Sequence, residues 1–122
     1  MSKNNYYRGY IFDLDGTIYL GEEAIPGAPK TIAKLREEGC GVIFLSNKPL
    51  EPRENYAKKL TKLGILTPTE DVINSSQVMI QYLLKEMPTA TVFPIGEKPL
   101  WDEFSAAGVS LSENPAEIEV VI

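Results

Sequence analysis

The pattern of hydrophobic and polar positions predicts an alternation of strands and helices. Residues 10–12 are an apolar run that leads into two acidic residues, and residues 42–45 are a second, continuous apolar run. Runs of this length, bounded by turn residues, are typical of strands buried on both faces of a parallel sheet. Between them, apolar residues recur at i, i+4 and i+7 from Ala28 until Gly39 ends the pattern, which predicts a helix. Strand, helix and strand form a βαβ unit, whose two strands run parallel.

The remaining pattern extends the same α/β organisation. We expect helices over residues 53–63, 75–87 and 100–107, and strands over residues 71–74, 91–95 and 119–122. Ser75 is the expected N-cap of the second of these helices. Pro94 disfavours a central place in a sheet for its strand, unless it lies at the last pairing. Residues 18–27, interrupted by glycine and proline, are expected to form an irregular flap over the end of the first strand.

Two carboxylates stand at the carboxyl end of the first predicted strand. Because side chains alternate along an extended chain, Asp13 and Asp15 project to the same side, roughly 6–7 Å apart, while Leu14 points into the core. Like charges held so close favour a bound cation or a retained proton. Gly16 lets the backbone turn, and the Thr17 hydroxyl can bond a carboxylate or a backbone amide. The simpler interpretation is an acidic turn, but open α/β sheets bind their ligands at this end of the strands.

A second set of polar groups follows the second apolar run. Since the carboxyl ends of parallel strands lie at one edge of a sheet, we expect Ser46 and Asn47 to approach the two aspartates. Hydroxyl, amide and backbone N–H groups suit the oxygens of a phosphoryl group. With a phosphate ester, Asp13 could attack phosphorus, and Asp15 could give a proton to the leaving oxygen and then take one from water. Mg²⁺ held by oxygen ligands would offset the negative charges of nucleophile and phosphate.

Composition narrows the class of protein further. The 122 residues fit one domain, and 43% hydrophobic with 24% charged residues is ordinary for a soluble globular protein. A net charge of −5 argues against sequence-independent binding to nucleic acid, which needs a basic surface. No apolar run is long enough to cross a bilayer, and residues 1–8 contain no apolar signal core, so we expect a cytoplasmic protein without membrane contact. The sequence leaves the oligomeric state open.

The chain contains no histidine, which excludes several kinds of active site. Ser-His-Asp and Cys-His nucleophilic systems, and metal sites built on imidazole, all need this residue. Acid and base chemistry must therefore fall to carboxylates, lysine or tyrosine. The single cysteine, Cys40, has no partner for an internal disulfide, so we expect a structural residue in a reducing compartment.

Two paired motifs resemble those of the haloacid dehalogenase superfamily. The first is Asp-Leu-Asp-Gly-Thr at residues 13–17 after an apolar strand, and the second is Leu-Ser-Asn at residues 45–47, which ends the next strand. More narrowly, Gly-Thr-Ile-Tyr at residues 16–19 with Ile-Pro-Gly-Ala at residues 25–28 resembles the nitrophenylphosphatase-like, NagD-like sugar phosphatase branch. The resemblance covers nearly the whole chain.

The resemblance implies a role for each matching residue. Asp13 would be the nucleophile and a Mg²⁺ ligand, and Asp15 would be the general acid/base whose backbone carbonyl also binds the metal. Ser46 and Asn47 would bind the phosphoryl group of a small phosphorylated metabolite. Gly16 and Thr17 would shape the flap at the bound phosphate and hold Asp15 in position.

The resemblance also implies an incomplete fold. The family has a three-layer Rossmann-like core, with helices on both faces of a parallel sheet, and this branch inserts a large cap after the first half of it. Residues 1–122 would be the N-terminal half of such a core, without the cap and without the C-terminal half. The third motif, a lysine, and the fourth, an acidic pair that completes the Mg²⁺ shell, normally lie beyond the cap. We therefore expect the chain alone to be inactive or weakly active as a phosphatase.

Other functions are open to the same residues. One is a phosphate- or Mg²⁺-binding module without turnover, because two of the four motifs are absent from this chain. Another is a response-regulator receiver, but a receiver needs an aspartate after its third strand, and residues 91–95 contain no acid. Lys48, next to Asn47, could reach a bound phosphate or face solvent, and we expect solvent.

Overall fold

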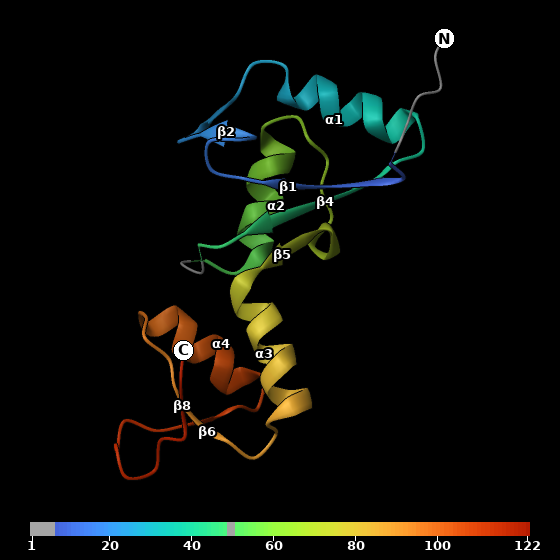
Figure 1. Ribbon diagram of the computed structural model, residues 1–122. Coiled ribbons are helices and arrows are strands. Elements are labelled where there is room, and N and C mark those ends of the chain that lie inside the picture. The colour runs from blue at the N-terminus through green and yellow to red at the C-terminus, as the bar shows by residue number, and fades with distance from the viewer. Residues whose placement is uncertain (1–6, 49–50) are drawn as a thin grey trace. The chain divides into compact units, whose positions relative to one another are not determined.

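The computed structural model describes residues 7–48 and 51–122, and Figure 1 shows the order of the elements. Residues 1–6 and Pro49 of the predicted turn after Asn47 lie outside this description. The length fits one domain, but the contacts divide the chain into two compact units. The first lies within Met1–Ser46 and Arg53–Ile73, and the second within Asn47–Pro52 and Asn74–Ile122. Each unit has its own hydrophobic core.

The first unit combines strands and helices in the predicted order. Its elements are β1 (Gly9–Asp13), β2 (Tyr19–Leu20), β3 (Glu23–Ala24), α1 (Ala28–Glu37), β4 (Gly41–Ser46), α2 (Arg53–Lys62), the 3₁₀ turn η1 (Thr69–Asp71) and β5 (Val72–Asn74), the last residue of which begins the second unit. The predicted strands and helices of this part are confirmed to within two residues at each end. The predicted flap contains a short antiparallel hairpin, β2 with β3.

The strands β1, β4 and β5 form one sheet in that order. β1 and β4 are parallel neighbours, as the βαβ pattern predicted, with Gly9 opposite Gly41 and Asp13 opposite Leu45. Figure 1 shows them side by side. Among the described strands β1 is therefore an edge of this sheet, and the carboxyl ends of β1 and β4 lie together.

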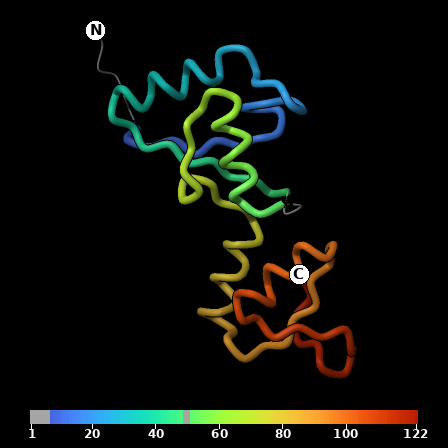
Figure 2. Tube along the Cα trace, turned by 180° about the vertical axis from the view of Figure 1, so that it is seen from behind, coloured from blue at the N-terminus to red at the C-terminus, as the bar shows by residue number. Residues whose placement is uncertain are grey.

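Both α1 and α2 pack on the same face of this sheet. Right-handed crossovers that proceed in one direction, from β1 to β4 to β5, put their helices on one side. Figures 1 and 2, seen from opposite sides, both show α2 against one side of β1 and β4. The core between the helices and the sheet includes buried residues from both layers, namely Ile32, Val42, Phe44, Leu60 and Val72.

The opposite face of the sheet is apolar and open. Ile11 on β1 is 71% exposed and Leu45 on β4 is 40% exposed, and Ile43, directly opposite Ile11, lies on the same face as Leu45. Parallel sheets are normally covered on both faces. In the part of the chain that the structure describes, this face has no helix of the first unit on it.

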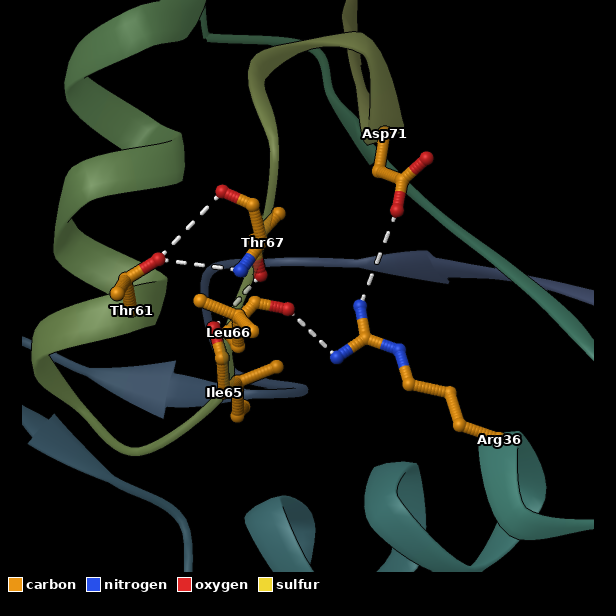
Figure 3. A network of polar contacts seen from close by, with 6 residues as sticks. All are labelled: Arg36, Thr61, Ile65, Leu66, Thr67 and Asp71. Carbon is orange, nitrogen blue, oxygen red and sulfur yellow. Dashed lines mark hydrogen bonds and ion pairs between the residues drawn. The ribbon is translucent and has the colours of Figure 1, made fainter.

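A network of polar contacts fixes the loop between α2 and β5 (Figure 3). The Thr61 hydroxyl accepts a hydrogen bond from the Thr67 N–H at 3.1 Å, and the Thr67 hydroxyl donates to the Ile65 carbonyl at 2.7 Å. From α1, Arg36 donates to the Leu66 carbonyl at 2.6 Å and faces Asp71 at 3.9 Å. The network positions the strand that follows this loop, because it ties the loop to both helices.

The second unit has a smaller sheet of its own. Its elements are α3 (Ser75–Glu86), β6 (Thr91–Phe93), α4 (Lys98–Ala106), β7 (Ser110–Leu111) and β8 (Val120–Val121). β6 lies between β7 and β8, parallel to both. The core of the unit consists of Ile80, Leu83, Val92, Phe104 and Val109. The chain is thus an α/β protein with parallel sheets, as predicted, although β7 was not expected.

Two details of the second unit differ from the sequence prediction. The N-cap of α3 is Asn74 and not Ser75, because the Asn74 side chain accepts the hydrogen bond from the Gln77 N–H at 2.9 Å. The strand around Pro94 is central in its sheet, but it ends at Phe93, so the proline lies outside the ladder. Within the described residues, no helix has the length and apolar character needed to span a bilayer.

Candidate active site

The end of β1 presents two carboxylates to solvent. Asp13 is the last residue of the strand, and both Asp13 and Asp15 are exposed. Leu14 between them is fully buried in the core with Phe44. The structure therefore confirms the predicted alternation, in which the leucine anchors the chain and the carboxylates project away from the core.

A tight turn after Leu14 holds the second carboxylate. The Leu14 carbonyl accepts hydrogen bonds from the N–H groups of Thr17 at 3.0 Å and Ile18 at 2.9 Å. The Gly16 N–H donates to the Tyr19 carbonyl at 2.8 Å, and Asp15 and Tyr19 form an isolated parallel bridge. Gly16 has φ +80, a conformation that residues with a Cβ rarely adopt. The turn thus connects Asp15 directly to the first strand of the flap.

The flap begins where this turn ends. Tyr19 pairs with Ala24 across the β2–β3 hairpin, and the Ile25 N–H donates to the Ile18 carbonyl at 2.9 Å. Tyr19 is 1% exposed and belongs to the core of the unit. The flap is therefore attached at its base to the same packed core as Leu14.

The end of β4 supplies the neighbouring polar group. Because Asp13 lies opposite Leu45, Ser46 is one residue further along the adjacent strand, and adjacent strands are about 4.8 Å apart. Ser46 is 3% exposed and continues the buried side of β4, after Val42 and Phe44, whereas Leu45 opposite Asp13 is on the exposed side. The serine thus shares the end of the sheet with Asp13 and Asp15 but alternates to its other face. Asn47 and Lys48 follow directly in the chain and are exposed, and by their contacts they are grouped with the second unit.

The donor set at this end of the sheet suits a hard divalent cation. Mg²⁺ commonly takes one or two protein carboxylates and completes its shell with water and substrate phosphate. Asp13 and Asp15 are two exposed carboxylates that share one strand end. Residues 7–48 and 51–122 contain no group of three or more acidic, cysteine or histidine side chains that could hold a metal. The site can thus offer two carboxylates, and further ligands would have to come from water, phosphate or other protein groups.

Comparison with known proteins identifies the family. Residues 10–110 match the family of haloacid dehalogenase-like hydrolases. The chain belongs to this family. The motifs at residues 13–17 and 45–47, which suggested the resemblance, both lie inside the matched region.

Several similar proteins are named as phosphatases. The chain is 38% identical over 114 residues to sugar-phosphatase AraL of Bacillus subtilis, an alignment that covers 93% of this chain and 42% of that protein. Its fold matches p-nitrophenyl phosphatase from Archaeoglobus fulgidus with a TM-score of 0.81 and 29% identity, covering 94% of this chain and 44% of the other. These relatives place the chain in the sugar-phosphatase and nitrophenylphosphatase branch, and the chain spans less than half of their length.

Two of the similar structures, both of one protein, contain a metal, which is magnesium in one and calcium in the other. The magnesium complex of this protein, the glycerol phosphate phosphatase from Mycobacterium tuberculosis, matches with a TM-score of 0.77 at 26% identity over 94% of this chain and 35% of that one.

The structure also reveals a contact to the flap that the sequence did not. Lys59 on α2 places its ammonium group 3.9 Å from the centre of the Tyr19 ring. In the sequence this lysine is one of several charged residues between apolar positions of a helix. No local pattern distinguishes it, because its partner lies forty residues earlier in the chain.

Proposed function

We propose that residues 1–122 supply the nucleophile and phosphate-binding part of a Mg²⁺-dependent phosphomonoester hydrolase. The substrate would be a small phosphorylated metabolite such as a sugar phosphate. The observation that supports this most directly is the pair of exposed carboxylates at the end of β1, beside the end of β4, in a chain of this family. The names of the relatives, sugar phosphatase and p-nitrophenyl phosphatase, support the same class of substrate.

In the first chemical step, Asp13 attacks the substrate. A carboxylate oxygen of Asp13 forms a bond to phosphorus as the bond between phosphorus and the ester oxygen breaks. Asp15 donates a proton to that oxygen, and the alcohol leaves. The product of this step is a phosphate group attached to the Asp13 carboxyl.

In the second step, water releases the phosphate. Asp15, now a carboxylate, accepts a proton from a water molecule whose oxygen attacks phosphorus. The bond between phosphorus and the Asp13 oxygen breaks, so that inorganic phosphate leaves and both carboxyl groups return to their starting states. One residue serves as acid and then as base because it stays beside the same oxygen position throughout.

Polar groups at the strand ends hold the phosphoryl group. The hydroxyls of Ser46 and Thr17 and the amide of Asn47 can donate to its oxygens. The N–H groups of Gly16 and Thr17 donate within the turn itself, so Gly16 would shape the loop at the phosphate. The carboxylate of Asp13 and the backbone carbonyl and side chain of Asp15 would hold Mg²⁺, which when bound offsets the charge between the nucleophile and the phosphate. The magnesium complex of the mycobacterial phosphatase supports this choice of metal.

We also propose that the chain corresponds to the N-terminal half of the family's hydrolase core. The relatives are more than twice as long as the aligned region, which leaves room for a cap, a lysine and a further acidic pair outside residues 1–122. On this basis the full activity needs residues that this chain does not contain. The buried Cys40, the single cysteine of the chain, supports a reducing, cytoplasmic location.

A binding module without turnover is the second candidate. It is favoured by one observation, that the described residues offer no cluster of three metal-ligating side chains. Loss of a single electrostatic partner in an active site commonly lowers kcat about 10²- to 10³-fold. Such a chain would bind phosphate or Mg²⁺ weakly and would not hydrolyse esters.

The test of the phosphatase proposal is the hydrolysis of p-nitrophenyl phosphate by the full-length gene product that contains residues 1–122. We expect activity with Mg²⁺ and none after its removal by a chelator. Asp13→Asn should lower kcat by at least about 10⁴-fold, the scale on which loss of a nucleophile falls. Asp102→Asn is the matched control, since this exposed carboxylate forms an ion pair with Lys98 on α4. Activity that survives in Asp13→Asn would exclude Asp13 as the nucleophile, and phosphate binding without hydrolysis would favour the binding module.

A further inference from the structure

Lys59 contacts the flap at two points from the neighbouring helix. Its ammonium group lies 3.9 Å from the centre of the Tyr19 ring and 3.6 Å from a carboxylate oxygen of Glu22. Tyr19 is on β2, and Glu22 is in the turn that joins β2 to β3. We propose that Lys59 is a positioning residue, which holds the flap against α2 and through Tyr19 holds the turn that bears Asp15. This inference rests on the proposed function for the role of Asp15.

Tyr19 is linked to Asp15, the proposed acid/base, by the backbone hydrogen bonds of one tight turn. Tyr19 forms a bridge with Asp15, and its carbonyl accepts the Gly16 N–H at 2.8 Å. A shift of the Tyr19 ring would therefore move the carbonyl that fixes Gly16, and with it the backbone next to Asp15. Proton transfer is sensitive to displacements of this kind, because the acid must lie within hydrogen-bond reach of the leaving oxygen.

The contact of Lys59 with Tyr19 is stronger than its contact with Glu22, because Tyr19 is more buried than Glu22. Tyr19 is 1% exposed, and the side chain of Lys59 is 26% exposed. Cation–π contacts gain strength when the cation is partly removed from water. The Glu22 side chain is 86% exposed, and ion pairs of that kind contribute little. Of the two contacts that Lys59 makes, the one with Tyr19 therefore contributes more to holding the flap.

The helix itself does not depend on this cation. Tyr56, Ala57 and Leu60 bury the inner face of α2 in the core. Removal of the charge at Lys59 should leave the helix packed and should loosen the flap alone. A local effect of this kind distinguishes positioning of the flap from a general contribution to stability.

The experiment measures amide hydrogen exchange at Gly16 in the 122-residue chain. Lys59→Met keeps an unbranched apolar side chain and removes the charge, and we expect Gly16 to exchange about threefold to thirtyfold faster. Lys59→Arg keeps a cation and should restore the slow exchange. Glu22→Gln, at an exposed position, should accelerate exchange by no more than about twofold. Lys58→Met is the control, since Lys58 is an exposed lysine on the same helix.

Each result decides for or against the proposal. Gly16 exchange that is unchanged in Lys59→Met, or equally accelerated in Lys58→Met, overturns it. Equal acceleration in the amides of α2 also overturns it, because that result would mean general destabilisation. Failure of Lys59→Arg to restore slow exchange would exclude the cation as the cause.

The exchange measurement needs no turnover, so it can fail or succeed independently of the phosphatase proposal. In a full-length protein that hydrolyses p-nitrophenyl phosphate, Lys59→Met should lower kcat with little change in KM. The reason is that Asp15 moves protons, whereas the phosphoryl group is bound by other residues. A change confined to KM would contradict the inference.

Discussion

Replacement of Leu14 by alanine should show how strongly the core anchors the two carboxylates. The leucine is fully buried between Asp13 and Asp15, so Leu14→Ala removes three carbon groups from a packed site. At about 0.8 kcal/mol for each group, the transfer term is about 2.4 kcal/mol. The cavity left in a partly relaxed core adds to this, so we expect the free energy of unfolding to fall by about 3 to 4 kcal/mol.

The assay is native-state hydrogen exchange of the β4 amides, together with urea unfolding followed by circular dichroism. Leu66→Ala is the matched control, because Leu66 lies in the same unit and is 76% exposed. By the same arithmetic the control should lose less than about 1 kcal/mol. If Leu14→Ala costs no more than Leu66→Ala, the reasoning is refuted, and the carboxylates must be held by the turn rather than by the core.

Two further predictions concern the metal and the second unit. The isolated chain should bind Mg²⁺ with a dissociation constant above about 0.1 mM, because a site with few charged ligands binds the ion weakly. A micromolar dissociation constant in calorimetry would contradict a site of two carboxylates. Asn74→Ala should destabilise the second unit by about 1 kcal/mol, because α3 loses its N-cap. Asn74→Ser keeps an acceptor and should lose less stability. Unfolding of the unit can be followed by the fluorescence of Trp101. Equal losses in the two variants would mean that the cap bond to Gln77 contributes nothing.

Periodicity predicted the elements of the first unit because each is defined by its own residues. The alternation around Leu14 was sufficient to predict which side chains face the core and which face solvent. The parallel arrangement of β1 and β4 followed from the connection between them, since a strand, a helix and a strand have one favoured handedness. The sequence pattern is therefore enough to predict that the two carboxylates and Ser46 lie at one end of a sheet.

Features that depend on distant or very short segments could not be predicted in this way. The hairpin of β2 and β3 has two residues in each strand, too few to show an alternation. The same holds for β7. The choice between Asn74 and Ser75 as the cap depends on the side-chain geometry toward Gln77, and either residue type is a good cap.

The division into two units was also beyond the sequence pattern. An apolar run predicts that a strand is buried but does not predict which strand it pairs with. The strand at β6 could have extended the first sheet by its composition alone, but it pairs with β7 and β8 instead. The contact of Lys59 with Tyr19 is a similar case, because packing of the flap against α2 exists only in three dimensions.

The open face of the first sheet has a consequence for handling the protein in solution. Ile11 and Leu45 form part of a water-exposed apolar strip, and β1 is an edge of this sheet among the described strands. Surfaces of this kind favour self-association and aggregation. We therefore expect the colloidal behaviour of the purified polypeptide at high concentration to depend on this strip, and mild detergent or a polar substitution at Ile11 to improve its solubility more than a change in salt.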